Sequence, residues 1–258
     1  GIATVTRQKY LTASEKGPWA NSYDRWRNDN LTHRYQGVQF GYTSAGRYTS
    51  WNDIWSYNAF KERDILPGDY KYEDWNGDGE INGQDEHPFA FDQTPWLQFS
   101  LNAGLQWKNF DFNMLLQGSA LGSMEYKEPL HEIWGKNGGG ALTHFLDRWH
   151  PLDPKADPYD PATVWTSGHY AYTGRWAKNN SAFNRVSTAY LRLKSIELGY
   201  TFPKLKQIPN ASLRVYANAY NLLTFTGVKF VDPEHPDDDL GRMYPLNKTY
   251  TLGVSLSF

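Results

Sequence analysis

The stretch KTYTLGVSLSF, residues 248–258, decides the fold of this chain. Every second position is apolar, with small or polar residues between; the apolar residues are Tyr250, Leu252, Val254, Leu256 and Phe258. Because side chains alternate across an extended backbone, all five lie on one face of a strand. Such a strand fits the edge of a soluble sandwich, and with about ten residues it also fits a barrel that crosses a membrane.

Four more segments alternate in the same way: residues 96–107, 110–118, 189–202 and 212–223. Along 189–202 the apolar positions change parity at Lys194 and Ser195. One extra residue in a strand restores the facing of the side chains, so this change of parity predicts a β-bulge.

The connections between these strands are alternately long and short. The short ones are residues 108–109 and 203–211, and the long ones are residues 1–95, 119–188 and 224–247. Outer-membrane barrels have short periplasmic turns and long outer loops, whereas a soluble sandwich has no reason for this order. The chain is therefore expected to be all-β: the C-terminal antiparallel strands of a large transmembrane β-barrel with long, partly folded extracellular loops.

This interpretation divides the chain into six parts. They are an extracellular loop at 1–95, a hairpin at 96–118, an extracellular loop at 119–188, a hairpin at 189–223, an extracellular loop at 224–247 and a terminal strand at 248–258. Five strands cannot close a barrel, since the smallest have about eight, so further strands must pair with these. The chain begins at Gly1 without a signal peptide, and we expect a fragment, a cleaved half or one piece of a split protein.

The composition excludes several classes of protein. The net charge is -2 without a basic block, so nucleic-acid binding has no support, and the absence of Cys excludes disulfides and Cys-based metal sites. Mean hydropathy is -0.70, and no apolar run approaches the roughly 18 residues of a membrane helix. No signature of a nucleophile elbow, a zinc protease or a nucleotide loop occurs, so an enzyme is not expected.

Residues 74–85, DWNGDGEINGQD, match a calcium loop of the EF-hand type. Oxygen-bearing residues recur at alternate positions, as their convergence on one hard cation requires. The candidate ligands are Asp74, Asn76, Asp78, Glu80 through its backbone carbonyl, and Asp85. An EF-hand has Glu at the last position, and the shorter Asp reaches the ion less readily. Either a structural Ca²⁺ fixes this long loop, or the segment is an Asx-rich turn without an ion.

Aromatic side chains are frequent in the segments assigned outside the membrane, and aromatic residues make up 16% of the chain. They could stack on sugar rings, grip peptides, pack against a partner or fill the cores of folded loops. The candidates for substrate or partner contact are Trp51, Trp55, Trp134, Trp165, Tyr170 and Trp176.

Polar residues of the two strands at 189–202 and 212–223 are expected to face an enclosed lumen. They either contact a plug or a substrate, or form a polar network along the barrel wall. These residues are Arg192, Lys194, Glu197, Arg214 and Tyr216.

Four stretches resemble, in this order, the C-terminal part of the SusC/RagA family of TonB-dependent outer-membrane transporters. They are GDYKY at 68–72 with the loop that follows it, AYLRLKSIELGYTFP at 189–203, LRVYANAYNLLTF at 213–225, and YP at 244–245 through KTYTLGV to the end. The LDRW motif at 146–149 also fits. The resemblance covers roughly residues 35–258 and implies a barrel of about 22 strands around a plug, of which this chain supplies the last strands.

The resemblance also implies a function and its partners. The whole protein would import large nutrients, glycans or oligopeptides, across the outer membrane of a Gram-negative bacterium, energised through TonB. The implied partners are the remaining strands and plug of the same transporter, a SusD-like surface lipoprotein, TonB through an N-terminal part absent here, and membrane lipid. The terminal apolar row with Phe258 resembles the signal that directs barrel assembly. The alternatives are a secreted, calcium-stabilised carbohydrate-binding β module and a non-transporting outer-membrane scaffold.

Overall fold

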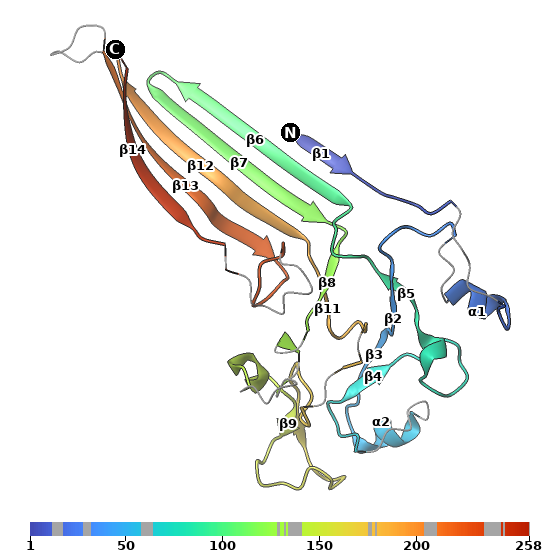
Figure 1. The fold of residues 1–258 in the computed structure, drawn as a ribbon. Helices are drawn as coiled ribbons and strands as arrows, with labels where there is room; N and C mark the ends of the chain where they lie inside the picture. Colours follow the sequence, from blue (N-terminus) through green and yellow to red (C-terminus); the bar gives the residue numbers. More distant parts are fainter. Residues whose placement is uncertain are drawn as a thin grey trace.

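The computed structural model describes residues 1–11, 18–27, 32–57, 64–127, 130–131, 133, 141–174, 177–178, 180–203, 211–234, 244 and 246–257. Its main element is a six-stranded antiparallel sheet in the order β1-β6-β7-β12-β13-β14 (Figure 1). The strands are β1 (Ile2–Val5), β6 (Leu97–Trp107), β7 (Phe110–Ala120), β12 (Tyr190–Phe202), β13 (Ser212–Thr226) and β14 (Thr249–Ser257). All of them except β1 are the segments in which the sequence alternates, and the all-β fold is confirmed.

The register of the sheet contains the bulge that the sequence predicts. Along β12 the pairing shifts between Leu193 and Ser195, against both β7 and β13. Opposite this point β13 has Asn221 with a φ of 52°. Beyond it β13 continues to Thr226, three residues further than the alternation indicates. Sequence reasoning ended the strand too early because the irregular backbone at Asn221 interrupts the period of two.

The two ends of the sheet differ, as the connection lengths predict. The turn between β6 and β7 is only Lys108 and Asn109, and it lies at the end of the sheet where β12 ends and β13 begins (Figure 1). We call this end the turn end. The long connections gather at the opposite end, here called the loop end, where they form a layer of short elements (Figure 1).

The layer at the loop end consists of four small two-stranded sheets and short helices. The strand pairs are β2 (Gln39–Gly41) with β5 (His87–Ala90), β3 (Ser44–Arg47) with β4 (Tyr70–Tyr72), β8 (Ser123–Glu125) with β11 (Arg185–Ser187), and β9 (His150–Pro151) with β10 (Trp165–Thr166). The helices are α1 (Ser22–Arg27), α2 (Trp51–Ser56) and the 3₁₀ turns η1 (Gly83–Asp85) and η3 (Thr143–Leu146). None of the helices among the described residues is long and apolar enough to cross a membrane.

The short strands of the first long loop, β2 to β5, were not apparent in the sequence. Strands of three or four residues contain too few positions to establish a period of two, so the segment reads as irregular. Helix α2 shows a local signal: Ser50 precedes it, and its hydroxyl accepts a hydrogen bond from the backbone N–H of Asp53 at 3.2 Å. This is an N-cap, which satisfies one of the free donors of the first turn.

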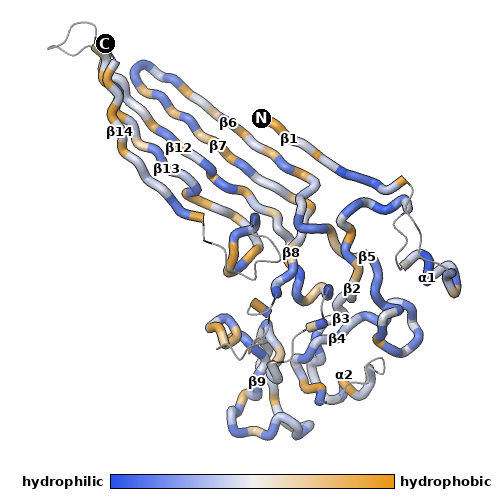
Figure 2. Tube along the Cα trace, in the orientation of Figure 1, coloured by the Kyte–Doolittle hydropathy of each residue, from blue (hydrophilic) through white to orange (hydrophobic). Residues whose placement is uncertain are grey.

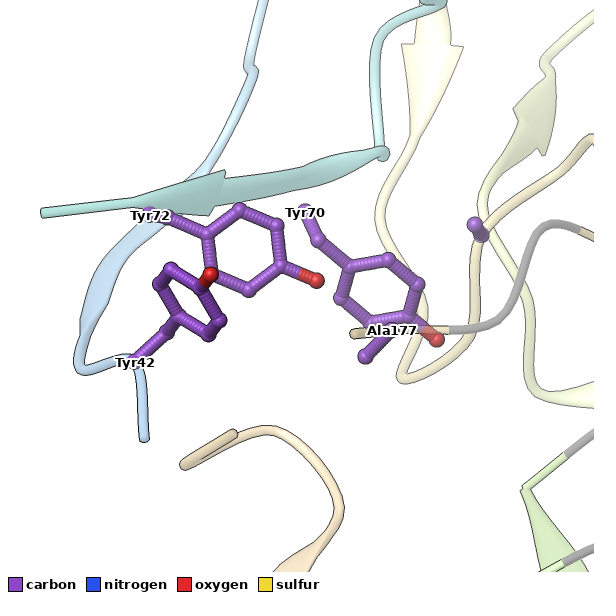
Figure 3. Packing of buried hydrophobic residues seen from close by; sticks show 5 residues of the cluster. Tyr42, Tyr70, Tyr72 and Ala177 are labelled. Atoms are coloured by element: carbon purple, nitrogen blue, oxygen red, sulfur yellow. The ribbon is translucent and has the colours of Figure 1, made fainter. Parts of the chain in front are cut away.

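A tyrosine-rich core joins the two longest loops. Tyr42, Tyr70 and Tyr72 come from the first loop and Ala171 and Ala177 from the second, and all five are buried. The rings of Tyr42 and Tyr72 lie edge to face with their centroids 5.7 Å apart. Figure 3 shows the two rings next to each other. The loops therefore form one packed layer and not two separate excursions of the chain.

Backbone hydrogen bonds connect the same two loops. The N–H of Tyr42 donates to the carbonyl of Asn180 at 3.0 Å, and the N–H of Ala182 donates to the carbonyl of Tyr42 at 2.9 Å. A second cluster, Ile133, Phe145 and Tyr170, lies within the second loop. Burial there raises the pKa of Tyr170 to about 12, so its ring stays neutral at physiological pH.

Candidate functional site

One face of the main sheet carries continuous apolar rows. Cross-strand pairing aligns the apolar residues of five strands, so that two adjacent rows are Leu105, Phe112, Leu198, Ala217 and Leu252, and Trp107, Phe110, Tyr200, Val215 and Val254. The hydropathy along each strand alternates accordingly (Figure 2). Leu252 is 85% exposed and Leu105 65%, and Val254 and Leu256 are exposed as well. Water-soluble folds bury such rows in a core, and the described residues form no such core here.

Both edges of the sheet are open. In the described part of the chain, β1 pairs only with β6, and β14 pairs only with β13. The outer side of β14 thus presents unpaired backbone groups along nine residues. An exposed edge of this length normally pairs with another strand, and in hydrocarbon it must do so. The sheet is therefore a segment of a larger sheet. Of the predicted terminal row, Tyr250 is exposed and Phe258 lies outside the described residues.

The opposite face of the sheet is polar and carries an ion-pair network. Arg214 of β13 donates to both carboxylate oxygens of Asp111 on β7, through Nε at 3.1 Å and through Nη2. Nη2 also donates to Glu197 on β12 at 2.6 Å. The guanidinium carbon lies 4.8 Å from the ring centroid of Tyr216. One cation therefore ties together three neighbouring strands.

Glycines make room for this network. A Cβ at Gly199 would lie 2.5 Å from a carboxylate oxygen of Asp111 and 2.6 Å from Nη2 of Arg214. The ion pair thus crosses β12 directly above a residue without a side chain. At Gly253, a Cβ would lie 2.2 Å from the ring of Tyr216, its cross-strand partner. Gly199 and Gly253 consequently allow large polar side chains to lie flat along the sheet.

Removing the cation at the centre of this network is expected to destabilise the sheet. Arg214→Ala leaves Asp111 and Glu197 close together without a counter-charge, and we expect a loss of about 2 kcal/mol in the free energy of unfolding. Urea unfolding of the full-length protein in detergent micelles measures it. Lys194→Ala, at the bulge and outside the network, is the control and should change stability by less than about 0.5 kcal/mol. Equal effects of the two substitutions would show that the network contributes nothing specific.

A second ion-pair cluster lies on the polar face near the loop end. Arg192 is 1% exposed and donates through Nη1 to Glu234 at 2.6 Å and through Nη2 to Asp232 at 2.5 Å. Its Nε donates to the hydroxyl of Thr224 at 3.0 Å, and the hydroxyl of Tyr190 donates to Glu234 at 2.8 Å. Two carboxylates and a hydroxyl accept the hydrogen bonds of this guanidinium. A buried cation is stable only with such partners.

The structure places four of the five predicted lumen residues on this polar face. Arg192 and Glu197 belong to the polar rows of β12, and Arg214 and Tyr216 belong to those of β13. Lys194 is the extra residue of the bulge and has no partner in either ladder. That this face lines a lumen stays a prediction.

The aromatic candidates have different environments. Trp51 and Trp55 of α2 have ring centroids 6.0 Å apart, and Trp55 is 64% exposed. Trp165 is half-buried and packs edge to face on Tyr172 at 5.4 Å. Tyr170 is a buried core residue, so its ring is occupied by packing and is not offered to a ligand. Two further candidates lie outside the described residues: Trp134 and Trp176.

The calcium-type loop is closed by hydrogen bonds to its own backbone. The carboxylate of Asp74 accepts from the N–H groups of Gly77, Asp78 and Gly79 at 2.8, 3.2 and 2.8 Å. The side-chain oxygen of Asn76 accepts from the N–H of Asp78 at 2.9 Å. This pattern holds the first half of the loop in consecutive Asx turns.

The second half of the loop is anchored by Asp85, which is fully buried. Its carboxylate accepts from the N–H groups of Trp75 at 2.9 Å and Asn82 at 2.8 Å, and thus closes the loop. Glu80 is exposed. No three acidic or histidine side chains of the described residues come together as ligands of one ion. In this conformation the carboxylates of Asp74, Asp78 and Asp85 accept hydrogen bonds from the backbone of the loop itself, and calcium binding stays a prediction.

Three carboxylates of the two clusters were not singled out from the sequence as site residues. Asp111 stands at a polar position of its strand, and that parity could have identified it as a partner for a cation. Asp232 and Glu234 lie in a loop after β13, where no periodicity indicates which way a side chain points. The only sequence signal was Arg192 itself, because a cation at a buried strand position requires a counter-charge.

Comparison with known proteins gives relatives over most of the chain. It is 28% identical to TonB-dependent receptor P3 of Formosa agariphila over 238 residues, 86% of this chain and 22% of that protein. TonB-dependent receptor SusC of Bacteroides thetaiotaomicron is 26% identical over 210 residues, 80% of this chain and 19% of that protein. The chain is related to SusC-type TonB-dependent receptors. It spans about a fifth of their length, and their names are those of receptors, in agreement with the expectation that it is not an enzyme.

Solved structures support the same fold for this chain. The RagAB peptide transporter superposes with a TM-score of 0.56 at 19% identity, covering 85% of this chain and 22% of that one. The RagAB peptide importer in its open-open state gives a TM-score of 0.52 at 19% identity, covering 97% of this chain and 25% of that one. No protein-family model matches the chain. The resemblance seen in the sequence and the barrel-type fold are thus confirmed.

Proposed function

We propose that the chain is part of the barrel of an outer-membrane active importer of large nutrients, either glycans or oligopeptides. The observation that carries the proposal is the sheet with two different faces and two open edges. Leu252 and its row are exposed on one face, while Arg214 binds two carboxylates on the other. An apolar outer face and a polar inner face, closed by further strands, are what a barrel in lipid requires.

The proposed location is the outer membrane of a Gram-negative bacterium. Strands β1 and β14 would pair with the remaining strands, a plug would fill the space at the polar face, and the terminal row of β14 would direct assembly. A SusD-like lipoprotein would cover the layer at the loop end, and TonB would act through another part of the protein. The support for these partners is the relatedness to SusC and the likeness to the RagAB structures.

Two alternatives predict different behaviour. A secreted carbohydrate-binding module would bury Leu252, Val254 and Leu256 in its core, and these residues are exposed. A non-transporting outer-membrane scaffold would have the same sheet but would not move solute. Only a transport measurement separates the scaffold from the importer.

The test of the proposal is uptake by cells that carry the full-length protein. Two labelled probes are offered, a maltooligosaccharide mixture and an oligopeptide mixture from digested casein. We expect at least one probe to enter, and entry to stop when either the transporter or TonB is deleted. Uptake of neither probe above the deletion strain, or uptake that persists without TonB, would contradict the proposal.

We also propose a structural Ca²⁺ in loop 74–85, because its residue spacing matches that of an EF-hand loop. Binding requires the side chains of Asp78 and Asp85 to turn away from the backbone N–H groups of Glu80 and Asn82, from which they accept hydrogen bonds. Millimolar Ca²⁺ is then expected to slow proteolysis within the loop of the full-length protein, and Asp78→Asn should remove the effect. Mg²⁺ at the same concentration is the control. Identical proteolysis with and without Ca²⁺ would leave the loop as an ion-free Asx turn.

A further inference from the structure

The segment 227–234 follows β13 and is here named the strap. It lies between the polar face of the sheet and the layer of folded loops, and it contacts both. Val228 within it is buried, at 8% exposed. In the described part of the chain, no ladder of backbone hydrogen bonds joins the strap to the sheet. Side chains therefore hold it in place.

On the side of the sheet, the strap is held by charge. Asp232 and Glu234 are the two carboxylates that bind the buried Arg192, and Tyr190 donates a third hydrogen bond to Glu234. Removing a carboxylate from a buried guanidinium costs much more than removing one from an exposed ion pair. These contacts are therefore expected to form and break together.

On the side of the loops, the strap is held by rings. The hydroxyl of Tyr126 accepts from the N–H of Lys229 at 2.8 Å and donates to its carbonyl at 2.9 Å. The ring of His144 stacks on Phe230, with centroids 4.3 Å apart and planes at 27°. The strap thus links the second long loop to β12, and neither can shift far while both sets of contacts are made.

The strap also borders a cavity of about 860 Å³ on the polar face near the loop end. Strands β6, β7 and β12 form its floor, and two strap residues form part of its side; the residues used below are Gln98, Gln117, Ser119, Tyr190, Pro233 and Glu234. Amides and hydroxyls share the lining with apolar groups, and among the described lining residues Glu234 carries the only charge. The residue that borders the cavity is therefore also one that holds the strap.

We propose that the strap is a latch for this cavity. Seated on Arg192, it closes the cavity at the loop end and ties the folded loops to the sheet. When the carboxylates leave Arg192, the strap moves away with the loops, and the guanidinium becomes hydrated in the opened cavity. We expect the strap to have two discrete positions. An intermediate position would leave the buried Arg192 without one of its carboxylates, which costs free energy, and packed elements of this kind are bistable. The latch rests on the proposed import function, since only a passage for solute needs to open.

The test uses the full-length transporter in lipid nanodiscs with one cysteine in the cavity, Gln117→Cys. These 258 residues contain no Cys, and any Cys elsewhere in the transporter is replaced by Ser. A positively charged methanethiosulfonate reagent reports access to the cavity. Asp232→Asn with Glu234→Gln removes the charges of the latch and retains its shape. We expect labelling to become about tenfold faster, which corresponds to about 1.4 kcal/mol. Backbone amides of the strap should also exchange hydrogen faster.

Controls separate the latch from general loosening. Glu197→Gln removes a carboxylate from the Arg214 network on the same face and should leave labelling of Gln117→Cys unchanged. Tyr126→Phe releases the loop side, leaves the Arg192 cluster intact, and should also accelerate exchange in the strap. The latch is overturned if the strap amides exchange hydrogen at the wild-type rate both in Asp232→Asn with Glu234→Gln and in Tyr126→Phe. It is also overturned if the strap amides exchange faster while labelling of Gln117→Cys stays unchanged. Uptake independent of TonB would contradict the proposed import instead, and would not alter these labelling rates.

Discussion

Leu252→Arg is expected to abolish assembly of the full-length barrel in a bilayer, whereas Thr251→Arg beside it is expected to be tolerated. Leu252 is 85% exposed in an apolar row, and Thr251 belongs to the polar row that contains Asn218 and Glu197. An arginine on the lipid face costs about 2–4 kcal/mol near the middle of the bilayer, while on the lumen face it remains hydrated. A penalty of this size is a large part of the net stability of a folded protein.

The measurement is the folded fraction after refolding into lipid vesicles, read from the gel mobility of unheated samples and from urea midpoints. The two substitutions add the same side chain at adjacent positions of one strand, so any difference between them reports the face and not the residue type. If Leu252→Arg folds as well as Thr251→Arg, the apolar rows do not face lipid, and the proposed location is wrong.

The second large effect is expected at Gly41→Ala in the layer of loops. A Cβ at Gly41 would lie 1.6 Å from the carbonyl oxygen of Asn180 and 2.7 Å from its carbonyl carbon. Both are backbone atoms, which cannot rotate away as a side chain does. The second loop must move off β2, and the hydrogen bonds of Tyr42 to Asn180 and Ala182 are lost with it. Overpacking together with two lost hydrogen bonds is expected to cost about 3 kcal/mol or more.

Limited proteolysis and hydrogen exchange of the full-length protein measure this effect at residues 39–47 and 180–187. We expect fast cleavage and exchange in both segments, with the main sheet unaffected. Gly83→Ala is the matched control. Apart from its chain neighbours, no heavy atom of the described residues lies within 4 Å of its Cβ position, and its backbone suits any residue. Equal protection of both loops in Gly41→Ala and the wild type would show that the two loops are not packed as described.

The sequence predicted the main sheet because one rule acts along its whole length. An apolar face and a polar face impose a period of two. At Lys194 this period is interrupted, and the interruption located the bulge. The layer of loops obeys no such rule. Its core is built from Tyr42, Tyr70 and Tyr72, which meet residues from another loop, and such contacts between distant segments have no local signature.

The candidate site was predictable to the same extent. Parity placed Arg192, Glu197 and Arg214 on one side of the sheet, and in the structure all three lie in the polar rows of the sheet. The carboxylates that pair with them were harder to predict from the sequence. Asp111 pairs with Arg214 across an intervening strand, which needs the strand order, and Asp232 needs the path of an irregular loop.

The joint core of the two long loops has a consequence for the order in which the polypeptide matures. The N–H of Lys178 donates to the hydroxyl of Tyr72 across 106 residues of sequence, so the first loop cannot complete its interior until the second has been delivered. Closing contacts of such long range is slow. During folding the early segment must therefore wait, incompletely folded, for the later one, and the β6–β7 hairpin between them brings the two within reach.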